Sequence, residues 1–171
     1  MINWAHVHLM INHFPVVGVL GAILLFLYGV VRKSREIKVV SLGVFVLLAL
    51  ITIPVFLTGE GAEGVVKNIP GVTEDYIGRH EEMASYALVL MELLGATAFL
   101  GLFLFRRYGN IPKWIIVLVL ILSLITAFVM GVTANFGGQI RHTEIRADFS
   151  GPPAQEPVKL SSILVDTSVL S

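Results

Sequence analysis

The chain has 171 residues, of which 56% are hydrophobic and 14% charged, and its formal net charge at pH 7 is zero. Soluble domains carry about a quarter charged residues, so this composition indicates a protein that faces lipid, and the balanced charge gives no support to a nucleic-acid partner. The absence of Cys excludes disulfides, thiolate metal sites, iron–sulfur ligation and covalent attachment of c-type haem.

Four apolar segments follow one another along the chain, each near the ~20 residues that cross a bilayer core. In hydrocarbon the backbone must satisfy its own hydrogen bonds, so each segment is predicted to be a helix. Short basic turns join the first to the second and the third to the fourth, which makes neighbours antiparallel. We therefore predict an all-α, up-down-up-down four-helix membrane bundle in residues 1–149 and an extended tail in 150–171. The expected spans are 14–31, 39–57, 83–105 and 115–132.

The two basic turns predict the orientation of the bundle. Together they hold seven Lys or Arg and one acid, whereas the segments at the other end hold five Lys or Arg and ten acids. The positive-inside rule then places the turns in the cytoplasm and both termini outside, as expected for a multi-pass protein of a bacterial inner membrane.

Two outer features are predicted from Gly and Pro. The Gly-rich, acidic stretch between the second and third spans (58–82) is expected to be a loop, with a short surface helix near 65–67. Pro15 leaves the carbonyl of Ile11 without its helical partner and is expected to kink the first helix, turning His13 toward the bundle axis.

All five histidines lie at the outer end of the predicted bundle. Neutral imidazole is a common ligand of haem iron and of metal ions. One interpretation is a b-type haem between the helices, with cationic side chains at its propionates. The candidate residues are His8, His13, His80, His142, Arg79 and Arg141.

Two other interpretations of these histidines stay open. The same four histidines, with Glu60 and Glu81 nearby, offer nitrogen and oxygen ligands for Cu, Zn or Fe, although no compact ligand motif is present. Histidines also suit a membrane interface without binding any cofactor, and His6 fits an exposed surface position best.

Glu92 is the one ionisable residue well inside a predicted span. An intramembrane carboxyl is costly and therefore a candidate for proton handling. It shares a helical face with Glu81 and Ser85, which lead toward the outer surface. The alternative is a hydrogen bond to Ser123 or Thr126 of the fourth helix that holds the packing.

The segment Asn12-His13-Phe14-Pro15, preceded by His8, resembles the first-helix signature of a bacterial family of small membrane proteins catalogued as domain of unknown function 2231. The signature is His-Pro-x-x-Val-His-Phe-Pro, and here Leu9 and Asn12 replace its first Pro and its Val. The resemblance extends over about residues 6 to 146 and includes Thr58-Gly59, His80 and Gly137-Gly138. It implies the four-helix fold and a setting among redox modules.

Three functions are therefore expected as alternatives. The first is a cytochrome-like subunit that binds haem b at the outer face for electron transfer within a larger redox complex. The second is a non-haem metal-binding membrane protein, and the third is a cofactor-free anchor or accessory subunit. No nucleophile elbow or catalytic triad is recognisable, so the chain is not expected to be an enzyme by itself.

Overall fold

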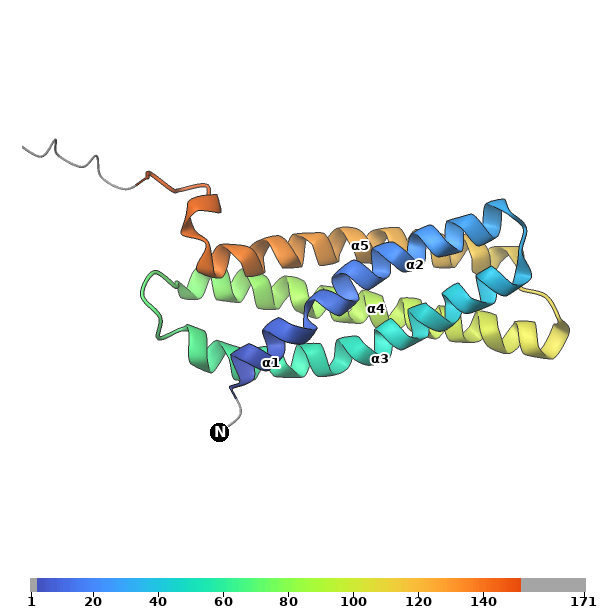
Figure 1. Ribbon diagram of the computed structural model, residues 1–171, viewed down its shortest axis with the longest axis horizontal. Coiled ribbons are helices and arrows are strands. Elements are labelled where there is room, and N and C mark those ends of the chain that lie inside the picture. The colour runs from blue at the N-terminus through green and yellow to red at the C-terminus, as the bar shows by residue number, and fades with distance from the viewer. Residues whose placement is uncertain (1–2, 152–171) are drawn as a thin grey trace, which may run out of the picture.

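The computed structural model describes residues 3–151, which form an antiparallel bundle of long helices (Figure 1). The elements are α1 (Trp4–Ile11), α2 (His13–Val31), α3 (Arg35–Val66), α4 (Glu74–Tyr108), α5 (Lys113–Arg141) and the 3₁₀ turn η1 (Thr143–Ile145). No strand occurs in this range, and the predicted all-α four-helix bundle is confirmed. Of the predicted tail, only its first two positions lie within the described residues.

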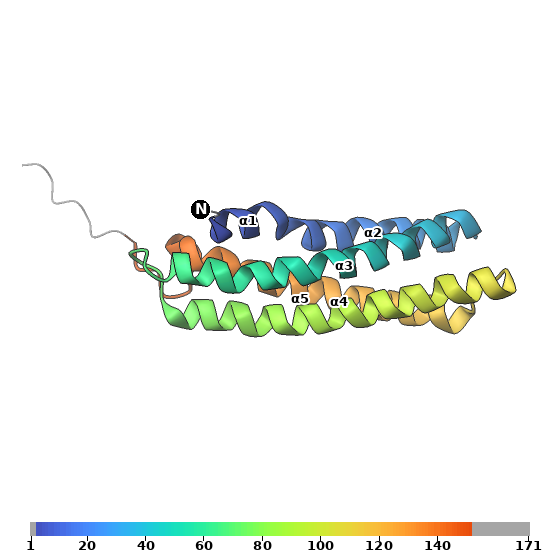
Figure 2. The same cartoon turned by 90° about the horizontal axis from the view of Figure 1, so that it is seen from below.

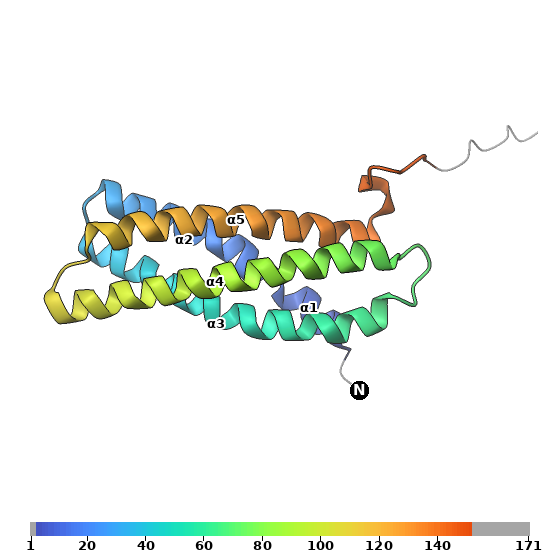
Figure 3. The same ribbon diagram turned by 180° about the vertical axis from the view of Figure 1, so that it is seen from behind.

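Four helical stretches are long and apolar enough to cross a membrane, with α1 and α2 together forming the first. The connections from α2 to α3 and from α4 to α5 lie at one end of the bundle, and the α3–α4 connection and the start of α1 lie at the other (Figures 1 and 3). We call the second end the histidine end, because all five histidines belong to it.

The core is a layer of apolar side chains between the four helices. Phe26 of α2 and Phe45 of α3 meet edge to face at 6.1 Å between ring centroids, and both are fully buried. Met91 of α4 and Ile115 of α5 complete the same core. Large apolar residues also cover the outside of the bundle, with Phe128 73% exposed. A bundle that is apolar on both its inside and its outside is a multi-pass membrane protein.

The helices extend further than their apolar segments at the histidine end. α3 runs on to Val66 and α4 begins at Glu74, so the expected loop and short surface helix between them are wrong; only 67–73 connects the two helices. Glycine costs a helix about 1 kcal/mol relative to alanine, yet Gly59 and Gly61 are helical because α1 packs directly on them. The contact between α1 and α3 here outweighs the low helix propensity of glycine.

The predicted kink in the first span is present. α1 ends at Ile11 and α2 begins at His13, with Asn12 between them. Pro15 is buried in the first turn of α2 and has no N–H to bond the Ile11 carbonyl. The change of direction carries α1 obliquely across α3 and away from α5 (Figures 1 and 2).

Candidate functional site

The docking of α1 on α3 builds one wall of the histidine end. A Cβ at Gly61 would lie 2.8 Å from Cβ and Cγ of Trp4, and one at Gly59 would lie 3.6 Å from Cε1 of His8. The absence of side chains at both glycines therefore lets the helices approach closely. This contact brings the ring of His8 onto the surface of α3.

The ring of His8 is held by two groups of α3. Its Nδ1 lies 3.1 Å from the carbonyl oxygen of Val55 and 3.2 Å from Oγ1 of Thr58. Thr58 donates its own proton to the same carbonyl, at 2.8 Å. Because a carbonyl oxygen can only accept, Nδ1 of His8 carries the proton and Nε2 of the neutral ring keeps its lone pair.

His80 is held in the same way, between α4 and α5. Its Nδ1 donates to the carbonyl oxygen of Thr133 at 2.9 Å. The ring packs against Gly137, where an added Cβ would be 3.0 Å from Cε1 and 3.2 Å from Nδ1. Nε2 of His80 therefore also keeps its lone pair.

These two part-buried histidines stand out from the other three. Both have Nδ1 fixed by a backbone carbonyl, and no hydrogen bond within residues 3–151 occupies Nε2 of either ring. A hydrogen bond from one ring nitrogen to a carbonyl is the usual support for a histidine whose other nitrogen binds a metal. The two histidines can therefore supply two nitrogen ligands from different helices.

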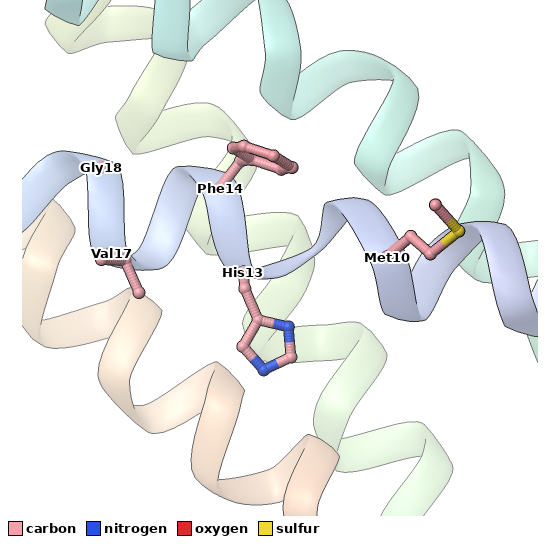
Figure 4. Close-up of a pocket in the computed structure, with 5 residues that line it drawn as sticks. All are labelled: Met10, His13, Phe14, Val17 and Gly18. Atoms are coloured by element: carbon pink, nitrogen blue, oxygen red, sulfur yellow. The ribbon is translucent and has the colours of Figure 1, made fainter.

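The structure does not bring His13 and His142 to the same place. His13 is exposed and lines an open cavity of about 510 Å³ with Met10, Phe14, Val17 and Gly18 (Figure 4). His142 follows α5 and its Nδ1 lies 2.8 Å from Oε1 of Glu144, with both side chains exposed. The backbone N–H of Glu144 and this contact lower the pKa of the Glu144 carboxyl. His6 is exposed, as predicted.

The predicted charged residues lie around the rim of this end. Arg79 pairs with Asp75 at 3.0 Å and lies 5.8 Å from the centre of the Tyr76 ring. Arg141 and Glu60 are exposed. Glu81 lies near Glu63 of α3. Within residues 3–151 no three His, Asp or Glu side chains are grouped closely enough to hold a metal ion.

One charged residue that the sequence did not single out organises the end of α5. Arg146 donates to the carbonyl oxygens of Gln139, Ile140 and Gly71 at 2.8, 3.0 and 3.0 Å, and its guanidinium lies 4.4 Å from the centre of the Tyr76 ring. Tyr76 in turn donates to Asp148 at 3.1 Å. Arg146 thereby ties the end of α5 to the α3–α4 connection, and only the position of an Arg just after a helix could have suggested this role.

Glu92 does not make the packing hydrogen bond that was one of its two interpretations. Ser123 donates to the carbonyl of Leu120 and Thr126 to that of Leu122, both within α5. The Oε1 atom of Glu92 is enclosed and has no hydrogen-bond partner. The carboxyl is therefore left without the partner that the sequence offered.

No family model matches the chain, and neither the curated proteins nor the solved structures contain a match to it. The resemblance to domain of unknown function 2231 thus stays a prediction.

Proposed function

We propose that this chain is a membrane subunit that binds one b-type haem at its histidine end, where His8 and His80 would hold it. The proposal rests on one observation: both imidazole rings have the same tautomer and the same kind of hydrogen bond. Each donates Nδ1–H to a backbone carbonyl and leaves Nε2 for a ligand bond, at 3.1 Å for His8 and 2.9 Å for His80.

The number of protein nitrogens available distinguishes haem from a bare metal ion. His8 and His80, which pack over Gly59 and Gly137, offer two nitrogens from two helices. Haem iron is satisfied by two protein nitrogens. A non-haem site needs three or more protein ligands, and residues 3–151 contain no such group. Haem is therefore favoured over a bare Cu, Zn or Fe ion.

Bound haem would supply one-electron chemistry, and the chain's own residues would set its position. Val55 and Thr133 would fix the ring orientations and raise the basicity of each Nε2 through their hydrogen bonds. All five histidines belong to one end of the bundle, so a second bis-histidine haem at the opposite end has no ligands. Such a subunit would exchange electrons along one membrane face, within a larger redox complex.

The basic turns support an outer location for this face. They hold seven of the twelve Lys and Arg residues and one acid, and the positive-inside rule then puts the histidine end on the outer side of a bacterial cytoplasmic membrane. Because the chain has no Cys, single cysteines at Asn68 and Asn110 give a direct test in intact cells. We expect a membrane-impermeant maleimide to label Asn68→Cys and to leave Asn110→Cys unlabelled; the opposite pattern would reverse the orientation.

The haem proposal is tested by the absorption spectrum of detergent-purified protein, expressed with ample haem and recorded before and after dithionite. The wild type should show a Soret band and the sharp bands of low-spin haem. His8→Ala and His80→Ala should each abolish the low-spin spectrum, whereas the matched variants His6→Ala and His142→Ala should retain it. A wild-type protein without a Soret band would contradict the haem proposal and leave His8 and His80 with only a structural role between helices. Elemental analysis of the same sample would then test the metal alternative.

A further inference from the structure

Glu92 lies midway along α4, and its carboxyl makes no hydrogen bond within the described residues. It is twelve residues from His80, or roughly 18 Å along the helix. Its Oε1 is enclosed by the chain itself without a partner, whereas Oε2 is not among the enclosed atoms. The side chain as a whole is part-exposed at the surface of the bundle, so Oε2 is the oxygen that a neighbouring molecule can reach. Since hydrocarbon offers no hydrogen bond to a carboxyl, this group calls for a partner from outside the chain.

A stripe of residues that runs through Glu92 faces away from the bundle. The buried side of α4 is formed by residues such as Met91 and Leu94. The stripe is part-exposed at Glu92 and exposed at its other members, with Val89, Phe99 and Phe103 more than half exposed. Its spacing alternates between four and three residues, which is the spacing of a helix–helix seam. We call it the α4 seam; its members are Ser85, Val89, Glu92, Ala96, Phe99 and Phe103.

The α4 seam has the composition of a membrane helix interface. Ser85 and Ala96 are small and exposed on either side of Glu92, and small residues let two membrane helices approach closely. Polar side chains in such an interface hydrogen-bond across it. Close approach at Ser85 and Ala96 would bring the Glu92 carboxyl to its counterpart.

We propose that the α4 seam is the interface of a symmetric homodimer, in which Glu92 hydrogen-bonds the partner's Glu92. Two copies in one membrane share the same orientation, so a two-fold axis along the bilayer normal sets their α4 helices parallel and each seam residue opposite itself. A protonated carboxyl both donates and accepts, and so it is complementary to its own copy. Because the carboxyl can pair with an identical carboxyl, we expect a second copy of this chain as the partner rather than another protein.

Cysteine cross-linking tests the seam directly, because the chain contains no Cys. We expect Ala96→Cys in membranes to form a disulfide-linked dimer with a mild oxidant. The matched control is Leu124→Cys, at an exposed mid-span position of α5 that is 57% exposed and should stay monomeric. Equal cross-linking at both positions, or cross-linking at Leu124→Cys alone, would overturn the proposal.

The role of Glu92 is tested by measuring association in detergent by sedimentation. Glu92→Gln keeps a donor and an acceptor and should dimerise like the wild type, whereas Glu92→Leu should weaken dimerisation roughly tenfold. Circular dichroism confirms that each variant is folded. A wild type that is monomeric at all concentrations, or a Glu92→Leu variant that dimerises like the wild type, contradicts the proposal; both readouts are independent of haem.

Discussion

The imidazole of His80 rests on the bare backbone of Gly137, so that an added Cβ would lie 3.0 Å from Cε1 of the ring. The same ring donates its Nδ1 proton to Thr133, one turn earlier in α5. A glycine and a carbonyl four residues apart thus fix the plane and the tautomer of one histidine. At His8 the carbonyl of Val55 holds Nδ1 in the same way, over Gly59.

Gly137→Ala should displace His80 and weaken haem binding. The new methyl group lies closer to the ring than an ordinary contact, so the ring must shift and its bond to Thr133 must lengthen. The measurement is the low-spin haem content per chain. The matched control is Gly131→Ala, where a Cβ meets nothing within 4 Å and where about 1 kcal/mol of helix propensity is gained. Equal haem content in the two variants would contradict the role of Gly137.

Gly61→Ala should loosen α1 from α3. A Cβ there would lie 2.8 Å from Trp4, and overpacking of this kind costs about 1–3 kcal/mol. We expect a lower midpoint of thermal unfolding and a changed emission from Trp4, one of only two tryptophans in the chain. Gly64→Ala, where a Cβ meets nothing within 4 Å, should instead raise the midpoint. A Gly61→Ala protein as stable as the Gly64→Ala protein would show that Trp4 is not held there.

Arg146→Ala should free the end of α5. It removes three hydrogen bonds from a charged donor to carbonyl oxygens of Gln139, Ile140 and Gly71. Bonds to charged groups contribute about 1.5–3 kcal/mol each, and these contribute less because the bond to Gly71 is exposed and the other two are only part-buried. Tyr76→Phe loses only the bond to Asp148 and should have a smaller effect. Amide hydrogen exchange of residues 138–146 measures both. Unchanged exchange in Arg146→Ala would show that Arg146 does not hold the end of α5 in place.

Acid should release the haem before it unfolds the bundle. A protonated Nε2 has no lone pair, so a proton competes with iron for His8 and for His80. The affinity for haem is therefore undiminished above the range in which the free imidazoles titrate, and it falls steadily as the pH drops below that range. A pH titration of the Soret band, with circular dichroism recorded in parallel, should show loss of low-spin haem while the helical signal persists. Haem retained until the helices unfold would argue against imidazole ligation.

The spans could be predicted from the sequence because lipid imposes one solution on a long apolar segment. The helix ends could not, since Gly59 and Gly61 have the composition of a loop and are helical only through contact with His8 and Trp4. The difference among the predicted histidines could not be read from the sequence for a similar reason. Position along the chain places His13 and His142 at the correct end of the bundle, but only packing separates them from the anchored rings of His8 and His80.

The role of Arg146 at the histidine end could not be predicted from the sequence. Its partner carbonyl at Gly71 is 75 residues away along the chain, and no local pattern links the two positions. Glu92 is the opposite case: its place within a span was evident from the sequence, and the structure added that Ser123 and Thr126 bond within their own helix. For both residues, the role could be inferred only once the structure showed which polar atoms already have hydrogen-bond partners.

The most direct test of the central claim is a haem titration of the apo protein in detergent, followed at the Soret band. We expect saturation at one haem per chain with a low-spin spectrum, and the loss of that spectrum in both His8→Ala and His80→Ala while His13→Ala and His142→Ala bind as the wild type does. Binding that does not saturate, or low-spin binding that survives in His8→Ala or His80→Ala, would contradict the account.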